Sequence, residues 1–261
     1  MSSSSMHGKV IAITGGASGI GLAAAIILYN RGASISIADN DQAALDKAST
    51  LFKNPTPTTP NPRLKLTNLD VRNRTAVDAW ISSTVTWGGK NQLDCAVNSA
   101  GVIGKHHGIR PVEDLDDSQW DLIIGVNLTG MMYCLRAELK NMPGPGSVVC
   151  VSSIQGTNGF ALHGAYSASK HGILGLVRSA AKEVGGRGVR VNAITPGAIA
   201  TPLMDKRDEL FGGKGQGDQP TTPIPRLGTA EECGTLIAWL LSDEASFVTG
   251  GTYGVDGGWG C

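Results

Sequence analysis

The sequence has no excess of charge of either sign and no long hydrophobic run. Lysine plus arginine number 22, as do aspartate plus glutamate, so the formal net charge is zero. A basic face of the kind that binds nucleic acid is therefore not predicted. No apolar run reaches the ~18 residues of a membrane-spanning helix, and Met1 to Ser5 lacks the apolar segment of a signal peptide. We expect no nucleic-acid or membrane partner.

Patterns for disulfides and metal sites are also missing. The five cysteines are odd in number and form no C-x-x-C pair, and Cys95 and Cys150 fall in apolar, strand-like runs. Such cysteines usually serve as small core residues, and free thiols suit a reducing compartment. The five histidines have no metal-ligand spacing beyond an exposed-looking His106-His107 pair. The expectation is a cytoplasmic protein without a metal ion.

What the sequence does contain is a regular alternation of strand-like and helix-like segments. This pattern predicts a single α/β domain with a parallel sheet of about seven strands, covered by helices on both faces. The predicted strands are 9–13, 34–38, 64–67, 93–97, 147–151, 189–194 and 252–255. The predicted helices are 19–30, 41–52, 73–86, 118–141, 164–185 and 229–241.

Three segments stand outside this alternation. Residues 1–7 are expected to form a flexible tail before a domain that spans 8–261. The Pro-rich segment 54–62 suits neither helix nor strand and predicts an exposed excursion. Residues 199–217 combine a short apolar stretch with a run of glycines, a composition that suits a lid over a substrate or, alternatively, a surface loop.

The first predicted strand runs into a glycine-rich turn, Thr14 to Gly21, and a helix-forming stretch follows it. Glycine lets the backbone approach a pyrophosphate, and the N-terminus of the helix offers unpaired N–H groups and a favourable dipole. A strand before the turn and a helix after it are the context that this motif requires. The segment therefore predicts a dinucleotide site.

The second predicted strand ends at Asp39, near the ~20-residue offset at which a carboxylate binds the ribose 2′-hydroxyl of the dinucleotide. A carboxylate there repels a 2′-phosphate, and the glycine turn has no arginine or lysine to attract one. NAD is therefore favoured over NADP. Alternatively Asp39 caps the next helix, a role that Asn40 or Asp41 could also fill.

Tyr166 and Lys170 lie four residues apart in a segment with helical apolar spacing. Four residues make about one helical turn, so the phenol and the ammonium share a face. A nearby cation favours phenolate and lowers a tyrosine pKa that starts near ~10. Such a tyrosine exchanges a proton with an alcohol or a carbonyl.

Together these motifs resemble the short-chain dehydrogenase/reductase family, in its single-domain branch, over about residues 8–258. The markers occur in the family's order: Thr14 to Gly21, Asp70-Val71, Asn98-Ser99-Ala100-Gly101, Asn127, Ser153, Tyr166 with Lys170, Pro196-Gly197, and Thr201. One position departs from the family, which usually has asparagine where this chain has Ser99. Because serine is small and polar, we expect the turn to be preserved.

The resemblance implies a doubly wound sheet, strand order 3-2-1-4-5-6-7, with every marker at the carboxyl edge. It implies that Asp70 contacts the adenine, unless it caps the following helix, and that the Asn98 to Gly101 turn lies against the adenosine ribose. The cofactor-binding candidates are Gly15, Ser18, Gly19, Ile20, Gly21, Asp39, Asp70, Val71, Asn98, Ala100, Gly101, Tyr166, Lys170, Pro196, Gly197, Ile199 and Thr201.

The resemblance also implies the catalytic set. Tyr166 exchanges the proton, Lys170 lowers its pKa and holds the nicotinamide ribose, and Ser153 donates a hydrogen bond to the substrate oxygen. Ser152 is the alternative donor. Asn127, a polar residue within an apolar helical face, holds a helix distortion whose free carbonyl anchors a water for proton relay. From the residues alone, it could equally be a core asparagine with its hydrogen bonds satisfied.

The predicted activity is hydride transfer between NAD and a secondary alcohol or ketone, in the oxidising direction, on a bulky hydrophobic molecule such as a terpenoid, steroid-like or polyketide compound. The expected pocket walls are 102–107, 154–163 and 199–217. A ketone reductase that uses NADH, a binding protein without catalysis and a nucleotide-sugar epimerase or dehydratase are alternatives. We expect the apolar positions Met132, Leu174 and Val177 to face outward. Together with them, the resemblance implies a homotetramer, with a dimer as the alternative.

Overall fold

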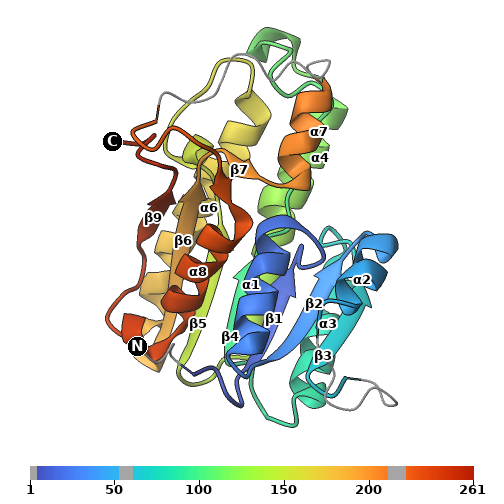
Figure 1. The fold of residues 1–261 in the computed structure, drawn as a ribbon, viewed down its shortest axis with the longest axis vertical. Coiled ribbons are helices and arrows are strands. Elements are labelled where there is room, and N and C mark those ends of the chain that lie inside the picture. Colours follow the sequence, from blue (N-terminus) through green and yellow to red (C-terminus); the bar gives the residue numbers. More distant parts are fainter. Residues whose placement is uncertain (1–4, 53–60, 211–221) are drawn as a thin grey trace.

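A seven-stranded parallel sheet organises the protein, in a computed structural model that describes residues 5–52, 61–210 and 222–261 (Figure 1). The strand order β3-β2-β1-β4-β5-β6-β9 confirms the predicted doubly wound sheet. The strands are β1 (Val10–Thr14), β2 (Ser34–Asp39), β3 (Leu64–Asn68), β4 (Cys95–Asn98), β5 (Gly146–Val151), β6 (Val189–Pro196) and β9 (Thr252–Val255).

The two faces of the sheet each bury one side of the central strands. In β1, Val10 and Ala12 belong to one hydrophobic cluster, whereas Ile11 and Ile13 belong to the other. Successive side chains of a strand point to opposite faces, so a strand covered on both sides must be apolar throughout. This requirement explains the apolar runs of the central strands β1 and β5.

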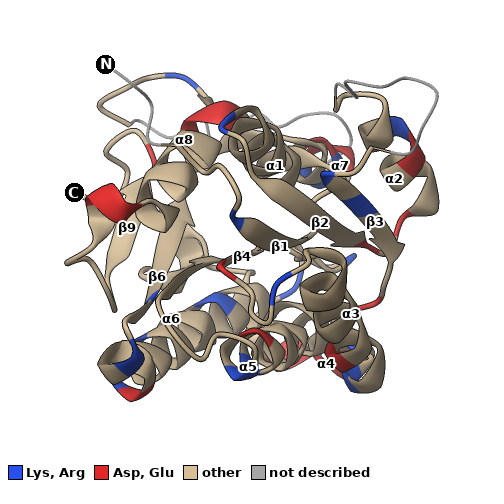
Figure 2. Cartoon of the chain, turned by 90° about the horizontal axis from the view of Figure 1, so that it is seen from below, with Lys and Arg blue, Asp and Glu red and all other residues tan. Residues whose placement is uncertain are grey.

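Three helices cover each face of the sheet (Figure 2). On one face lie α1 (Gly19–Asn30), α2 (Gln42–Ser49) and α8 (Ala230–Leu241). On the other face lie α3 (Arg74–Trp87), one long helix and α6 (Gly164–Val184). The long helix consists of α4 (Asp117–Ile124), a π-helical segment (Gly125–Gly130) and α5 (Met131–Lys140). All six predicted helices are present.

The helix Asp117–Lys140 differs from the expectation that no segment is apolar enough to span a membrane. Its 24 residues pass that test by length and composition, and 44% of its most apolar stretch is buried inside the protein. Met131, Cys134 and Leu135 pack in the core beneath the sheet. Burial against the sheet accounts for these apolar residues.

The N-terminal segment is tied to the domain earlier than the boundary expected at residue 8. Met6 is fully buried in the same cluster as α1, and its N–H donates to Arg31 O at 2.9 Å. Most of the Pro-rich segment 54–62 lies outside the described residues.

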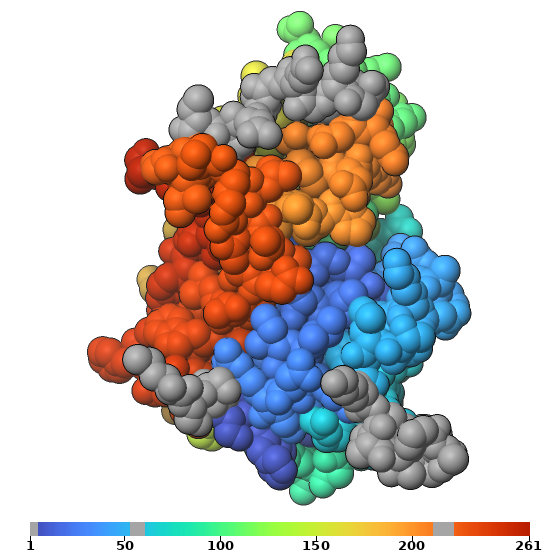
Figure 3. Space-filling model, viewed as in Figure 1, coloured from blue at the N-terminus to red at the C-terminus, as the bar shows by residue number. Residues whose placement is uncertain are grey.

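Beyond the carboxyl ends of the strands lie β7 (Ile199–Ala200), which pairs with β8 (Gly228–Thr229), and α7 (Pro202–Leu210). In the space-filling view α7, in orange, lies above the blue N-terminal part of the chain (Figure 3). This helix occupies the first part of the predicted lid, whose glycine run, 212–217, lies outside the described residues.

Candidate active site

The glycine turn after β1 is shaped by close backbone approaches. Gly15 has φ +62°, and a Cβ added there would lie 2.7 Å from Ala100 N. A Cβ at Gly21 would collide with the carbonyl oxygen of Gly15. Ser18, the N-cap of α1, makes no side-chain capping hydrogen bond. The first N–H groups of α1 thus stay available for an anion, which suits a pyrophosphate.

Asp39, at the end of β2, lies over this turn. Its carboxylate accepts hydrogen bonds from Ala17 N at 3.1 Å and from Asp41 N at 3.2 Å. The N-cap of α2 is Asp41, whose side chain accepts from Ala44 N at 3.0 Å. The alternative role of Asp39 as that helix cap is therefore wrong.

Asp70, after β3, has a different local role from the helix cap that was considered. The N-cap of α3 is Asn73, whereas Asp70 pairs with Arg72 at 2.6 Å. Hydrogen bonding from Arg72 lowers the pKa of Asp70. Val71 is buried and its side chain packs against Gly130, so only its backbone is free to meet a cofactor.

The turn after β4 keeps its shape with serine at position 99. Ser99 N donates to Thr14 O at 3.2 Å, and Ala100 N donates to Thr14 Oγ1 at 3.4 Å. Asn98 begins this turn, whose place against the adenosine ribose stays a prediction. Its side chain is fully buried and donates to Glu138 Oε2 at 2.8 Å, so its amide supports the turn from inside the protein.

Glu138 is a polar core residue that the sequence analysis missed. It is fully buried, its Oε1 has no hydrogen-bond partner among the described residues, and burial raises its pKa to about 8. The signal was available in the helical spacing: Glu138 follows Met131, Cys134 and Leu135 at the i+7, i+4 and i+3 positions of one face. All four are buried.

Asn127 lies in the π-helical segment and is fully buried. Its Oδ1 accepts from Val102 N at 2.8 Å, and its Nδ2 donates to Val102 O at 3.0 Å and to Ser169 Oγ at 3.2 Å. The helix distortion expected at this asparagine is thus present, and its side chain joins the turn after β4 to α6. The water relay remains a prediction.

Ser153, Tyr166 and Lys170 come together at the carboxyl edge of the sheet. Ser153 hydrogen-bonds with the phenol of Tyr166, and its oxygen accepts from Gln155 N at 3.1 Å. Lys170 Nζ lies 5.5 Å from the Tyr166 ring centroid. Ser152 instead donates to Lys170 O at 2.8 Å and is buried, so Ser153 is the serine placed beside the phenol.

The ionisation of this pair differs from the expectation that Lys170 lowers the pKa of Tyr166. Burial raises the pKa of Tyr166 to about 12, opposed by the hydrogen bond from Ser153. Burial also lowers the pKa of Lys170 to about 8, and Nζ donates to Val151 O at 3.0 Å. In the protein alone, loss of solvation is the largest influence on the pKa of each of the two groups.

The segment from Pro196 to Thr201 brings the last predicted cofactor residues to the same edge. Gly197 packs closely on Asp256: a Cβ added at Gly197 would lie 2.9 Å from the Cα of Asp256. Thr201 Oγ1 donates to Ile199 O at 3.2 Å, and its Cγ2 would touch a Cβ at Gly19 at 3.4 Å. The start of α7 therefore borders the glycine turn.

An apolar cluster surrounds the phenol of Tyr166. It contains the buried side chains of Ile103, Ile123 and Ala165, and Leu210 from α7 packs against it. His107 also lies against the Tyr166 ring, with centroids 5.2 Å apart. Of the predicted walls, 102–107 contributes Ile103 and His107 beside Tyr166, and the described part of 199–217 contributes Leu210 to the cluster.

The arrangement is that of an oxidoreductase built on a dinucleotide-binding sheet. An uncapped helix N-terminus, a carboxylate at the end of β2 and a Tyr–Ser–Lys group all lie on one edge. These residues fit a nicotinamide dinucleotide, whose pyrophosphate Gly15 to Gly21 would hold and whose second ribose Lys170 would hold. That cofactor, when bound, supplies the hydride-accepting and hydride-donating ring.

The chain belongs to the short-chain dehydrogenase/reductase family. The family model described as enoyl-(acyl carrier protein) reductase matches residues 15–260. The chain is 48% identical over 266 residues to the short-chain dehydrogenase/reductase ABA4 of Pyricularia oryzae, covering 99% of this chain and 96% of that protein. It is 35% identical to the cyclohexanol dehydrogenase of an Acinetobacter species, with coverage of 98% and 96%. The crystal structure of levodione reductase superposes with a TM-score of 0.89 at 32% identity, covering 97% of this chain and 98% of the other.

Proposed function

We propose that this protein is an NAD-dependent oxidoreductase that oxidises a secondary alcohol on a bulky hydrophobic molecule to the ketone. The observation that carries the proposal is the convergence of Ser153, Tyr166 and Lys170 beside the glycine turn. A Cβ added at Gly101 would lie 3.5 Å from both Lys170 Nζ and Asn127 Oδ1. The proton-handling group and the dinucleotide-binding edge are therefore adjacent.

Each side chain has a distinct task in this proposal. Tyr166 takes the hydroxyl proton as the hydride leaves the carbon, and returns it in the reverse reaction. Ser153 donates a hydrogen bond to the same substrate oxygen and stabilises its negative charge. Lys170 holds the nicotinamide ribose and favours the phenolate once the site is filled. Asn127 fixes the turn beside them.

The preference for NAD rests on Asp39. Its carboxylate, at the end of β2, accepts hydrogen bonds from Ala17 N and Asp41 N. The turn Thr14 to Gly21 contains no basic residue. A hydroxyl at the ribose 2′-position can donate to that carboxylate, whereas a 2′-phosphate is repelled by it.

Replacing Asp39 with alanine should narrow the preference for NAD over NADP by about 10- to 100-fold, because a hydrogen bond to a charged group contributes ~1.5–3 kcal/mol. The measurement is kcat/KM with each cofactor. Asp41→Ala removes a neighbouring carboxylate that caps α2 and serves as the control with an unchanged ratio. Equal efficiency with both cofactors in the unmodified enzyme contradicts the assignment.

The substrate class rests on the cluster around Tyr166. The side chains of Ile103, Ile123 and Leu210 form an apolar surround for the phenol, which suits a hydrophobic carbon skeleton such as a terpenoid, steroid-like or polyketide compound. Similarity to a cyclohexanol dehydrogenase supports a ring-bound alcohol. A ketone reductase that uses NADH is the alternative, because the same groups serve both directions.

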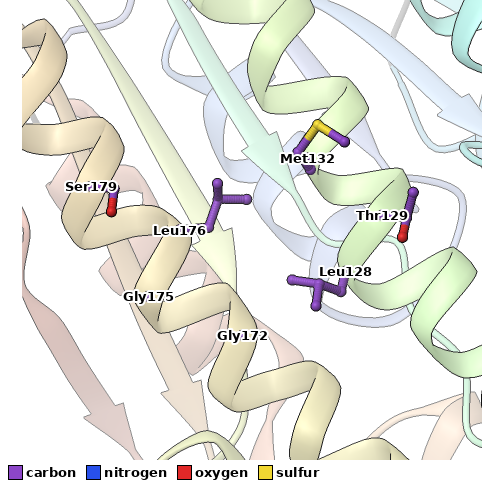
Figure 4. Close-up of a pocket in the computed structure, with 7 residues that line it drawn as sticks. All are labelled: Leu128, Thr129, Met132, Gly172, Gly175, Leu176 and Ser179. Carbon is purple, nitrogen blue, oxygen red and sulfur yellow. The ribbon is translucent and has the colours of Figure 1, made fainter.

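We also propose a homotetramer, with a dimer as the alternative. A shallow groove of about 420 Å³ runs between α5 and α6 (Figure 4). Its lining residues are Leu128, Thr129, Met132, Gly172, Gly175, Leu176 and Ser179. Leu174 and Val177, expected to face outward, are buried in the core, so the contact surface consists of the groove residues instead.

Gly175→Trp tests this assembly. A Cβ at position 175 meets nothing within 4 Å, so a side chain there extends into open space at the groove. Light scattering at micromolar concentration should show a tetramer for the unmodified protein and a smaller species for the variant. Gly185→Trp, on another open position, should keep the full assembly. A monomeric mass for the unmodified protein contradicts the proposal.

A further inference from the structure

An aromatic row extends from the phenol of Tyr166 to the C-terminal segment. His107 packs edge-on against Tyr166, with centroids 5.2 Å apart, and His163 stacks on His107 at 4.0 Å with an interplanar angle of 3°. Phe160 lies 6.1 Å from His163, and Trp259 meets Phe160 at 5.6 Å. The row therefore begins at the phenol where the substrate oxygen would react.

Two loops hold the histidine stack in place. His107 N donates to Gly104 O at 3.2 Å, and Gly108 N donates to Leu162 O at 3.0 Å. Leu162 has φ +65°, a left-handed conformation that costs a leucine ~1–3 kcal/mol and persists only where the surroundings enforce it. The loop after β4 and the loop after β5 are thus joined at the stack.

The nitrogens of His163 have a fixed arrangement. Ser167 Oγ donates to Gln155 Oε1 at 3.2 Å, which leaves the amide nitrogen of Gln155 as the donor to His163 Nδ1 at 3.1 Å. His163 therefore carries its hydrogen on Nε2 when neutral. This chain of hydrogen bonds orients the outer ring of the stack.

His107 is different because one of its nitrogens is left without a partner. The side chain is buried, and its Nδ1 is enclosed with no hydrogen bond among the described residues. Burial, together with the charges of His163 and Arg207, lowers the pKa of His107 to about 3, so the ring is neutral and has a single N–H. An enclosed N–H without an acceptor is unfavourable, so we assign the hydrogen to Nε2, which is not among the buried nitrogens that lack a partner.

We propose that His107 recognises a second oxygen on the substrate, a hydroxyl or carbonyl group on the same ring system as the reacting alcohol, by donating a hydrogen bond from Nε2. His163 and Phe160 follow His107 in the row, so their rings would contact the part of the carbon skeleton beyond the second oxygen. This inference rests on the proposed function. It names the substrate class more narrowly, as cyclic diols and hydroxyketones in place of simple alcohols.

The test compares kcat/KM for cyclohexanol with kcat/KM for cyclohexane-1,2-, 1,3- and 1,4-diol, with NAD as the cofactor. In the unmodified enzyme at least one diol should be about 3- to 10-fold better than cyclohexanol, the value of one neutral hydrogen bond. His107→Phe keeps a ring against Tyr166 but removes the donor, and should bring that ratio to about one. His107→Gln, which restores an N–H donor, should recover part of the ratio.

The control is His7→Phe, a substitution at an exposed histidine outside the row and outside the predicted pocket walls, and it should keep the ratio of the unmodified enzyme. An unmodified enzyme that treats all four alcohols alike overturns the inference while leaving the proposed function intact. So does a His107→Phe variant whose efficiency falls in proportion for cyclohexanol and diol, since His107 then only positions Tyr166. If none of the alcohols yields NADH, that result contradicts the proposed function itself.

Discussion

Replacing Tyr166 with phenylalanine should lower the rate of hydride transfer by roughly 10²–10⁴-fold, the contribution of a positioned acid or base. The substitution keeps the ring that His107 and Ile103 contact and removes only the hydroxyl. NAD affinity should change little, because the glycine turn, Asp39 and Lys170 remain. Single-turnover formation of NADH with an active alcohol measures the step directly.

The pH dependence of alcohol oxidation provides a second measurement on the same residue. The ionised phenol is the active form, so the rate should rise with pH through the pKa of Tyr166 and then level off. That pKa is about 12 in the protein alone. With NAD bound, the positive nicotinamide should lower it well below that value, by stabilising the phenolate.

Tyr133→Phe is the matched control for both measurements. Tyr133 lies on α5 with its ring beneath Arg136, away from the Ser153 group, so the rate and the pH profile should be those of the unmodified enzyme. A Tyr166→Phe variant with a near-normal rate and an unchanged pH profile shows that another group handles the proton.

The stability of the protein should fall as the pH rises through about 8, and Glu138→Gln should remove most of this fall. The pKa of Glu138 is raised in the folded protein from its ordinary 4.5 to about 8, mainly by burial. A group whose pKa is raised in the folded protein stabilises the fold fully at pH values below its unfolded-state pKa. This stabilisation is lost as the pH rises through its folded-state pKa. The loss amounts to at most about 5 kcal/mol.

The free energy of unfolding, measured in urea from about pH 5 to about pH 9, tests this expectation. Glutamine keeps the acceptor for Asn98 but cannot ionise, so its curve should be flatter over that range and higher at the alkaline end. The exposed Glu113→Gln serves as the control, with the slope of the unmodified protein. Identical slopes for Glu138→Gln and the unmodified protein contradict a buried neutral acid at this position.

The sequence alone predicted the features that depend on local pattern. The strand–turn–helix around Gly15 and the four-residue spacing of Tyr166 and Lys170 each arise within one continuous segment. The strand order followed from the resemblance to a family. These predictions needed no knowledge of which distant side chains meet.

Features that depend on packing between distant segments could not be predicted. The raised pKa of Tyr166 results mainly from its burial, which depends on how separate segments pack around the ring. Leu174 and Val177 lie in the core because α6 is buried over a wider face than its apolar spacing indicated. Asp70 pairs with Arg72 while Asn73 caps α3, a choice among neighbouring polar residues that only the geometry decides.

The most direct test of the account is NADH formation when the purified protein is given NAD and a panel of cyclic secondary alcohols, with the matching ketones and NADH as the reverse assay. The account predicts turnover of at least one alcohol–ketone pair, with NADP a poorer cofactor than NAD. Binding of NAD without turnover of any pair in either direction would show instead a dinucleotide-binding protein without this catalysis, and would contradict the central claim.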